Sequence, residues 1–175
     1  MELWDVYDMY RNKTNRTTIR GTELQSGDYH LVLHVCIFNS NGEMLIQQRQ
    51  PFKEGWSNMW DITVGGSAVV GDFSQTAAQR ELYEEIGLKL DFENIRPHLT
   101  MHFDRGFDDI YIIEKDVDLH TLRLQYEEVQ AVKWASKEDI LSMIRSGEFI
   151  TYHESLIELL FDLRKKRGST KRIAK

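Results

Sequence analysis

The chain has very little cysteine and very little proline. Its 175 residues include one cysteine and two prolines. A single cysteine excludes an internal disulfide, and Cys36 lies within the apolar segment 31–38, where we expect a buried structural thiol. There is also no internal repeat and no low-complexity linker. Nothing in the sequence therefore marks a boundary between domains, and we expect one domain covering residues 1–175.

Long apolar segments are also missing. No segment approaches the length of a membrane span, and the chain begins with acidic residues rather than with a signal peptide. We therefore expect a cytoplasmic protein without membrane contact. The net charge of −6 argues against a role in coating nucleic acids, although phosphate groups can still bind where a metal ion reverses the local charge. The hydrophobic content of 41% is enough for a real core.

What the chain does have is a helix-forming segment with well-defined ends. Good helix formers fill residues 75–86, Ser74 is the expected N-cap, and Gly87 supplies the expected left-handed C-terminal stop. Three apolar residues recur at every fourth position and predict a buried stripe: Ala78, Leu82 and Ile86. The helix is thus expected to pack one face against a core.

The same helix concentrates negative charge on a neighbouring stripe. Glu81, Glu84 and Glu85 stand at positions i, i+3 and i+4, so their side chains are expected to point toward one spot. Such clustering is repulsive unless a divalent cation with oxygen ligands offsets it. Arg80 precedes Glu84 by four residues and is placed to hold it. A solvated acidic helix face is the alternative for this pattern taken alone.

The context of these residues resembles a known family. The box of the Nudix hydrolases reads Gly-x5-Glu-x7-Arg-Glu-U-x-Glu-Glu-x-Gly-U, where U is aliphatic, and residues 66–88 follow it in register. Asp72 stands where the box has its first Glu, which keeps the charge but shortens the side chain by one methylene. All other specified positions match: Gly66, Arg80, Glu81, Leu82, Glu84, Glu85, Gly87 and Leu88.

The resemblance implies a site and a reaction. Nudix enzymes are pyrophosphohydrolases that cleave nucleoside diphosphates linked to another moiety, by attack of water on phosphorus with bound Mg²⁺ or Mn²⁺. It places the metal ligands at Glu81, Glu84, Glu85 and the carbonyl of Gly66. Catalytic roles fall on Glu81, Glu84 and Arg80. The expected partner is a small nucleoside diphosphate derivative, whereas the sequence specifies neither its leaving group nor the number of metal ions.

The general base and the substrate contacts stay open. Members of the family use either a box glutamate or an acid of a later loop as the base, and the later candidates here are Asp104, Asp108, Asp109, Glu127 and Glu128. For substrate binding we expect Gly65, Asp109 and Arg49, with exposed pairing of Arg49 to Glu54 or Asp61 as the alternative. Three aromatic residues near the box have two readings, stacking on a base or packing in the core: Phe52, Trp56 and Trp60.

Two rival functions have to be considered. The segment before the box is also similar to isopentenyl diphosphate isomerases, whose catalytic cysteine would stand at Gly65 and whose box is degenerate. Without that proton donor the isomerase reaction cannot run in the same way. The second rival is a Nudix module that senses nucleotides without cleaving them. Retention of all acids on the metal-binding turn favours hydrolysis over sensing.

The remaining pattern predicts the fold. Strands are expected at 4–10, 16–20, 29–38, 44–48, 98–103, 110–113 and 129–134, and further helices at 136–146 and 153–166. This order predicts an α/β protein, a Nudix-type α/β/α sandwich with a mixed sheet and an N-terminal β-hairpin. The basic segment 167–175 is expected to be a flexible tail. A homodimer is compatible with the sequence, which does not define the oligomeric state.

Overall fold

The computed structural model describes residues 2–170 and contains two sheets. A small sheet joins β1 (Leu3–Tyr7) to β2 (Lys13–Ile19). The large sheet has the order β5-β4-β3-β8-β7, with β6 added beside β3 and β9 beside β4. Its strands and the helices span the following residues: β3 His30–Phe38, β4 Met44–Arg49, β5 Trp60–Asp61, β6 Val64–Ser67, α1 Ser74–Ile86, β7 Leu99–Phe103, β8 Gly106–Glu114, η1 Leu119–Thr121, β9 Val129–Ala135, α2 Lys137–Ser146 and α3 Glu154–Lys165.

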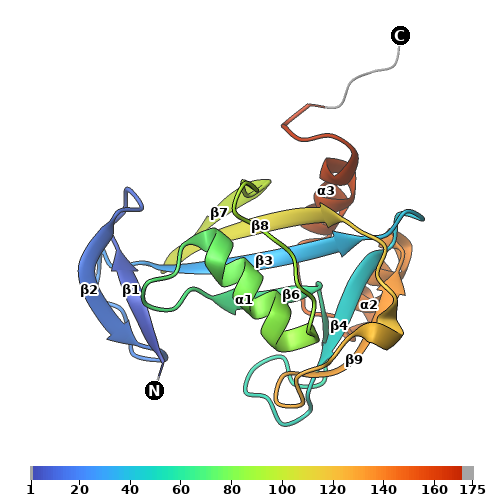
Figure 1. Cartoon of the computed structure of the whole chain (residues 1–175), viewed down its shortest axis with the longest axis horizontal. Helices are drawn as coiled ribbons and strands as arrows, with labels where there is room; N and C mark the ends of the chain where they lie inside the picture. Colours follow the sequence, from blue (N-terminus) through green and yellow to red (C-terminus); the bar gives the residue numbers. More distant parts are fainter. Residues whose placement is uncertain (1, 171–175) are drawn as a thin grey trace.

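Helices cover both faces of the large sheet (Figure 1). The parallel pair β3–β8 forms its centre over nine matched residues, whereas the other pairs are antiparallel. Side chains of β3 alternate between two cores: Leu33 and Val35 pack with α1, and Cys36 and Phe38 pack with α2 and α3. The expected mixed α/β/α sandwich is therefore confirmed, and Cys36 is fully buried.

The turn residues 39–42 also predict a second hairpin, between the strands at 29–38 and 44–48, and this prediction was mostly wrong. The turn at residues 39–42 exists, but β3 and β4 pair only at Phe38 and Met44. Beyond that point β3 pairs with β6 and β8, and β4 pairs with β9 and β5. The strands diverge because each of them pairs over more residues with strands from other parts of the chain than the two pair with each other. This divergence opens the sheet where the box begins.

The N-terminal hairpin is confirmed, with its turn earlier than expected. The Asp8 carboxylate accepts hydrogen bonds from the backbone amides of Tyr10 and Asn12, at 2.9 and 2.8 Å, and so closes the turn before residue 13. Residues 171–175 of the expected basic tail lie outside the described part of the chain. No helix within residues 2–170 has the length and apolar character needed to cross a membrane.

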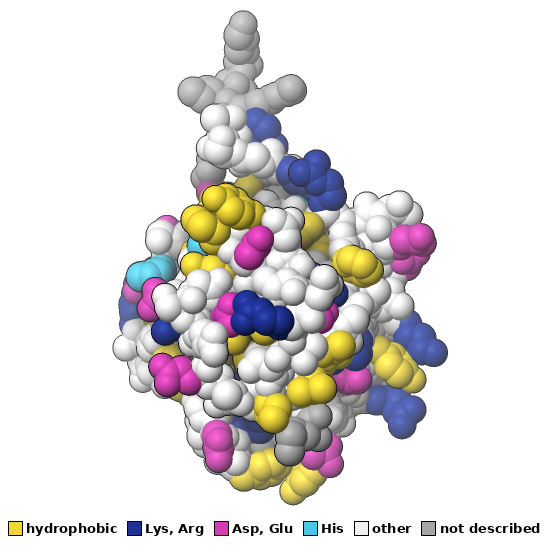
Figure 2. All heavy atoms as spheres, turned by 90° about the vertical axis from the view of Figure 1, so that its left-hand side faces the viewer, with side chains coloured by type: hydrophobic (Ala, Val, Ile, Leu, Met, Phe, Trp, Pro, Cys, Tyr) yellow, Lys and Arg dark blue, Asp and Glu magenta, His cyan; other side chains and the backbone are white. Residues whose placement is uncertain are grey.

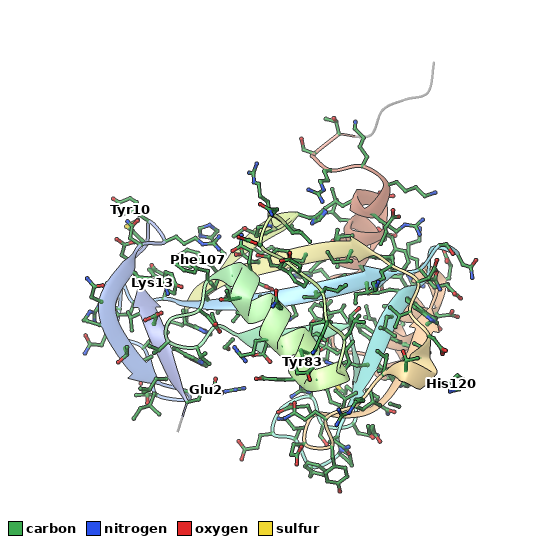
Figure 3. The ribbon with its side chains drawn as sticks, in the orientation of Figure 1. Glu2, Tyr10, Lys13, Tyr83, Phe107 and His120 are labelled. Atoms are coloured by element: carbon green, nitrogen blue, oxygen red, sulfur yellow. The ribbon has the colours of Figure 1, made fainter. Side chains whose placement is uncertain are left out.

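The hairpin is tied to the loop that precedes α1. The amide of Val70 donates to the Leu3 carbonyl at 2.9 Å, and the amide of Gly71 donates to Asp5 Oδ2 at 2.9 Å. Lys13 points from β2 toward this loop and donates to the Asp72 carbonyl at 2.7 Å (Figure 3). Seen from its outer side, the hairpin face carries separate hydrophobic groups interrupted by charges of both signs (Figure 2). The hairpin is thus positioned by polar contacts with the box loop.

His30 makes the packing of the hairpin sensitive to pH. Its ring stacks on Trp4 at 4.3 Å, its Nδ1 is buried without a hydrogen-bond partner, and burial lowers its pKa. The folded pKa of His30 lies below the ordinary 6.5, so the buried neutral ring contributes stability to the hairpin packing above pH 6.5. That contribution is lost as the pH falls through the folded pKa. We expect faster amide exchange in residues 3–19 at pH 5 than at pH 7.5, after correction for intrinsic rates. His30→Phe should remove the difference, and its persistence there would rule out this imidazole as the cause.

Candidate active site

Helix α1 forms as predicted, with one correction at its start. It spans Ser74–Ile86, and Gly87 ends it with φ of 72° in the left-handed region. Phe73, rather than Ser74, is the N-cap residue. The Ser74 hydroxyl is buried and lies 2.7 Å from the Tyr111 hydroxyl, so it bonds to the neighbouring strand β8, and the Thr76 hydroxyl accepts the Phe73 amide at 2.9 Å. Because its hydroxyl bonds to Tyr111, Ser74 does not cap the helix as expected.

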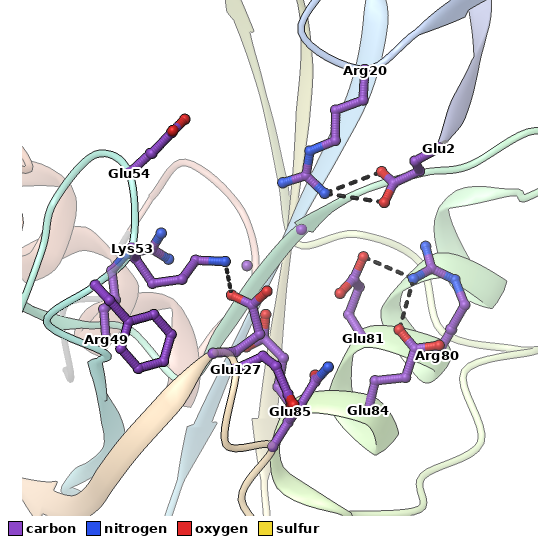
Figure 4. Close-up of a pocket in the computed structure, with 15 residues that line it drawn as sticks. Glu2, Arg20, Arg49, Lys53, Glu54, Arg80, Glu81, Glu84, Glu85 and Glu127 are labelled. Carbon is purple, nitrogen blue, oxygen red and sulfur yellow. Dashed lines mark hydrogen bonds and ion pairs between the residues drawn. The ribbon is translucent and has the colours of Figure 1, made fainter.

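The acidic side of α1 forms one wall of a cleft of about 650 Å³ (Figure 4). The opposite wall comes from Arg49 at the end of β4, from Lys53 in the loop after it, and from Glu127 in the loop before β9. The hairpin adds Glu2 and Arg20, which pair at 3.1 Å. Strands β4, β6 and β9 thus bring together segments that are far apart in the sequence.

Arg80 organises the carboxylates of the box. Its guanidinium donates to Glu81 at 2.9 Å, to Glu84 at 3.1 Å and to Asp72 at 3.0 Å, and it also donates to the Ser67 carbonyl at 3.1 Å. The predicted contact with Glu84 is present. Asp72, the residue that departs from the box, closes the loop onto Arg80 and does not line the cleft. Its shorter side chain is thus used for the loop rather than for the acidic turn.

Glu85 has a different partner, which the sequence did not indicate. Glu85 is 6% exposed, and its carboxylate accepts a hydrogen bond of 2.9 Å from the side-chain amide of Gln47 on β4. Burial raises the pKa of Glu85 well above its usual value, with the Gln47 hydrogen bond opposing the shift. The Oε1 atom of Gln47 is buried without a partner. The sequence feature that could have pointed to this contact is the pair of polar residues Gln47-Gln48 at the end of an otherwise apolar predicted strand.

The backbone at Gly66 makes room for Glu81. A Cβ atom at Gly66 would lie 2.3 Å from the Glu81 carboxyl carbon, so no other residue leaves this carboxylate in place. Burial raises the pKa of Glu81 to about 7, with Arg80 opposing the shift. Gly65 is confined as well, because a Cβ there would lie 2.5 Å from the His34 ring. His34 in turn lies 2.8 Å from Asp108.

The donor set of this wall fits a hard divalent cation. Glu81, Glu84, Glu85 and the Gly66 backbone offer oxygen atoms, and seven carboxylates against four basic groups line the cleft. Within residues 2–170, however, no three acidic, histidine or cysteine side chains are already arranged as a metal site. Instead, Arg80 donates hydrogen bonds to Glu81 and Glu84, and Gln47 donates one to Glu85. A cation would therefore compete with these hydrogen bonds.

Only some of the other predicted site residues line the cleft. Arg49 lines the cleft, its Nε is buried without a partner, and within residues 2–170 it forms no ion pair with Glu54 or Asp61. Asp109 does not reach the cleft, because it is fully buried in β8 and pairs with Arg11 and Thr100. Among the proposed general bases, Glu127 and Glu128 line the cleft, whereas Asp104, Asp108 and Asp109 do not. Sequence reasoning missed four lining residues: Glu2, Arg20, Lys53 and Gln125.

The three aromatic residues near the box lie in different environments. Trp60 packs against the core shared with α2 and α3 and is covered by Lys133, whose ammonium lies 4.3 Å from the ring centroid. Phe52 is 57% exposed and lines the cleft. Trp56 is half exposed but does not line the cleft. Trp60 therefore packs in the core, and of the three residues Phe52 alone lines the cleft.

Comparison with known proteins agrees with this arrangement. Residues 28–155 match the family described as NUDIX domain. A Nudix hydrolase of Listeria innocua is 48% identical over 164 residues, covering 94% of this chain and 96% of the relative. A crystal structure from Deinococcus radiodurans has a TM-score of 0.72 at 23% identity, covering 91% and 97% of the two chains. The NUDIX domain of Shewanella oneidensis NrtR, complexed with ADP ribose, has a TM-score of 0.57 at 19% identity, covering 74% and 84%. The chain thus belongs to the Nudix family, whose hydrolases act on diphosphate bonds.

Proposed function

We propose that this protein is a metal-dependent pyrophosphohydrolase that cleaves a nucleoside diphosphate linked to another moiety, by attack of water on phosphorus. The observation that carries the proposal is the placement of Glu81, Glu84 and Glu85 opposite the basic groups Arg49 and Lys53 across one cleft. Acidic groups suit a cation, and the basic groups suit the phosphate oxygens that extend beyond it.

In this proposal Mg²⁺ or Mn²⁺ is held by Glu81, Glu84, Glu85 and the Gly66 carbonyl. When bound, such an ion neutralises phosphate oxygens and lowers the pKa of a coordinated water. Arg80 keeps the acidic turn aligned, and Gln47 holds Glu85 in its rotamer. Arg49 and Gly65 line the same cleft, where the guanidinium of Arg49 provides positive charge for the phosphates.

Two carboxyl groups of the cleft are positioned to serve as the general base. One is Glu81, which lies on the acidic wall of the cleft. The other is Glu127, which lines the opposite wall. Glu128 also lines the cleft, but it is engaged with Lys53 at 2.6 Å. Isomerisation is not proposed, because the single cysteine of the chain is buried in the core and Gly65 stands at the place of the isomerase cysteine.

The test is product detection across a panel of nucleoside diphosphate derivatives, including ADP-ribose, nucleotide sugars, dinucleoside polyphosphates and coenzyme A. Each is incubated with Mg²⁺ or Mn²⁺ and separated by chromatography, with isopentenyl diphosphate as a control for isomerisation. We expect cleavage at a diphosphate bond of at least one compound, and its loss on adding EDTA. Nucleotide binding without cleavage of any panel member would instead support the sensing module.

A further inference from the structure

The N-terminal hairpin lies outside the residues that match the family, yet it contacts the loop of the box. The family match begins at residue 28, whereas β2 ends at residue 19. Lys13 of β2 donates to Asp5 Oδ2 of β1 and to the Asp72 carbonyl, both at 2.7 Å (Figure 3). Asp5 Oδ2 also accepts the Gly71 amide at 2.9 Å. Lys13 and Asp5, here called the hairpin pair, therefore bind two consecutive residues of the loop that leads into α1.

Burial contributes little to the position of this loop. None of residues 69–72 is buried, and none of the four belongs to either hydrophobic core. The loop makes polar contacts with the hairpin, where the Val70 amide also donates to the Leu3 carbonyl at 2.9 Å. On its other side the Asp72 carboxylate accepts a hydrogen bond of 3.0 Å from Arg80. The position of the loop is therefore set by polar contacts, and the hairpin supplies several of them.

The hairpin has attachments of its own to the rest of the protein. Arg11, between β1 and β2, pairs with Asp109, which is fully buried in β8. Arg16 of β2 pairs at 2.5 Å with Asp28, which precedes β3. Neither ion pair includes a residue of the loop 69–72. The hairpin is thus held by the large sheet as well as by the loop, and it can act as a support for the loop.

Arg80 connects this loop to two of the proposed metal ligands. It donates to Asp72, and also to Glu81 at 2.9 Å and to Glu84 at 3.1 Å. A cation at the acidic turn has to compete with Arg80 for the two glutamates, while Asp72 competes with the glutamates for Arg80. When the loop is fixed, Asp72 retains Arg80 and leaves both glutamates available to the cation. A displaced loop would release Arg80 to pair fully with Glu81 and Glu84, and the affinity for the cation would fall.

We infer that Lys13 and Asp5 are positioning residues for the acidic turn, and that they act on Glu81 and Glu84 through the loop 69–72 and Arg80. This inference rests on the proposed function and gives the hairpin, which lies outside the matched residues 28–155, a role at the same site. Neither member of the hairpin pair lines the cleft. Groups that orient a metal ligand directly contribute about 10- to 100-fold to metal affinity, and the hairpin pair acts through further residues, so we expect about tenfold.

The experiment measures metal binding without turnover. Dissociation constants of Mg²⁺ and Mn²⁺ are determined by calorimetry for the wild-type protein and for Lys13→Met, which keeps the length of the side chain but removes its charge and its donors. We expect binding to weaken about tenfold, and amide exchange in residues 69–73 of the metal-free variant to become faster. Asp5→Asn is the second variant and should weaken binding as well. Lys13→Arg retains charge and donors and should bind the metal more tightly than Lys13→Met.

Arg16→Met is the matched control. It removes the ion pair with Asp28, which also attaches the hairpin but includes no residue of the loop. We expect it to lower the midpoint of urea unfolding of the metal-free protein and to change the metal dissociation constants by less than about twofold. A double variant tests the route through Arg80. In an Arg80→Met background, Lys13→Met should have no further effect on metal affinity.

Several results would overturn the inference. One is unchanged metal affinity in both Lys13→Met and Asp5→Asn, and another is an equal loss in Arg16→Met, which would show that the hairpin only supports the fold. An undiminished effect of Lys13→Met in the Arg80→Met background would also contradict it. A wild-type protein that binds neither ion would reject both the inference and the proposed function. Hairpin-dependent metal binding by a protein that cleaves no compound of the panel would uphold the inference and reject the hydrolase.

Discussion

Glu85→Gln is expected to lower kcat/KM for the metal-dependent cleavage by more than about 100-fold. Residues that merely orient a metal ligand contribute about 10- to 100-fold, so loss of a ligand itself should exceed that range. The substitution keeps the size of the side chain, and the new amide oxygen can still accept the hydrogen bond from Gln47. Turnover is measured on whichever panel compound the wild-type protein cleaves. Glu158→Gln, on the exposed side of α3, is the matched control and should retain full activity.

The same variant should be at least as stable as the wild type in metal-free buffer. Burial raises the folded pKa of Glu85 above its ordinary value of 4.5, so the stability provided by its protonated form is present below that value. It is lost as the pH rises through the folded pKa, and the glutamine, which never ionises, avoids this loss. Thermal unfolding at pH 5 and pH 8 should show a gap between variant and wild type that widens with pH.

Added Mg²⁺ should reverse this order of stability. A ligand that binds only the folded state raises its stability, so the Tm of the wild type should rise with Mg²⁺ and that of Glu85→Gln should rise less. Undiminished turnover in the variant would remove Glu85 from the mechanism. A variant that is less stable than the wild type at pH 8 without metal would mean that the Gln47 contact outweighs the burial of charge.

Gly66→Ala is expected to lower turnover by about 100-fold, although it adds only one methyl group. The new Cβ would lie 2.3 Å from the Glu81 carboxyl carbon, so this side chain must move by about an ångström or more. A displacement of that size at a reacting centre reduces the rate by about 100-fold. Crowding should also reduce the free energy of unfolding by about 1–3 kcal/mol. Both quantities are measured on the purified variant, by steady-state kinetics and by urea unfolding.

A double variant separates this collision from a general effect of the loop. Glu81→Ala removes the side chain that the new methyl group meets, so Gly66→Ala should reduce stability far less in that background than in the wild type. Activity should stay low in both backgrounds because Glu81 itself is lost. Equal destabilisation in the two backgrounds would show that the backbone at position 66, rather than Glu81, resists the substitution.

The local sequence was sufficient for the elements that short-range physics controls. Gly87 stops α1 in the left-handed conformation. Ser136 and Asp139 form a capping box at the start of α2 with reciprocal bonds of 3.1 Å, as their spacing of three residues indicates. The apolar segment 31–38 placed β3 to within one residue, since a strand was expected at 29–38 and β3 spans His30–Phe38. Spacing also put Arg80 beside Glu84. Each of these depends on neighbours within about four positions, which the sequence contains.

Long-range contacts decided the points on which the sequence was wrong or silent. Ser74 bonds to Tyr111 rather than capping its helix, and Asp109 is buried against Arg11, which comes from the other end of the chain. The divergence of β3 and β4 likewise depends on pairing with β6 and β9. No local pattern reports such partners, because they lie tens of residues away and compete with one another only in the folded chain.

By itself, then, the sequence determined the family, the acidic helix and the residues that the box assigns to a metal, since their spacing alone places them on one helix. The tertiary structure decided what surrounds them. It brought Gln47 to Glu85, set Arg49 and Lys53 across the cleft, and added Arg20 from the hairpin. It also paired Phe52 with Tyr126, 74 positions later in the chain. The reason is physical: helical spacing is a property of consecutive residues, whereas a cleft exists only once distant strands have paired.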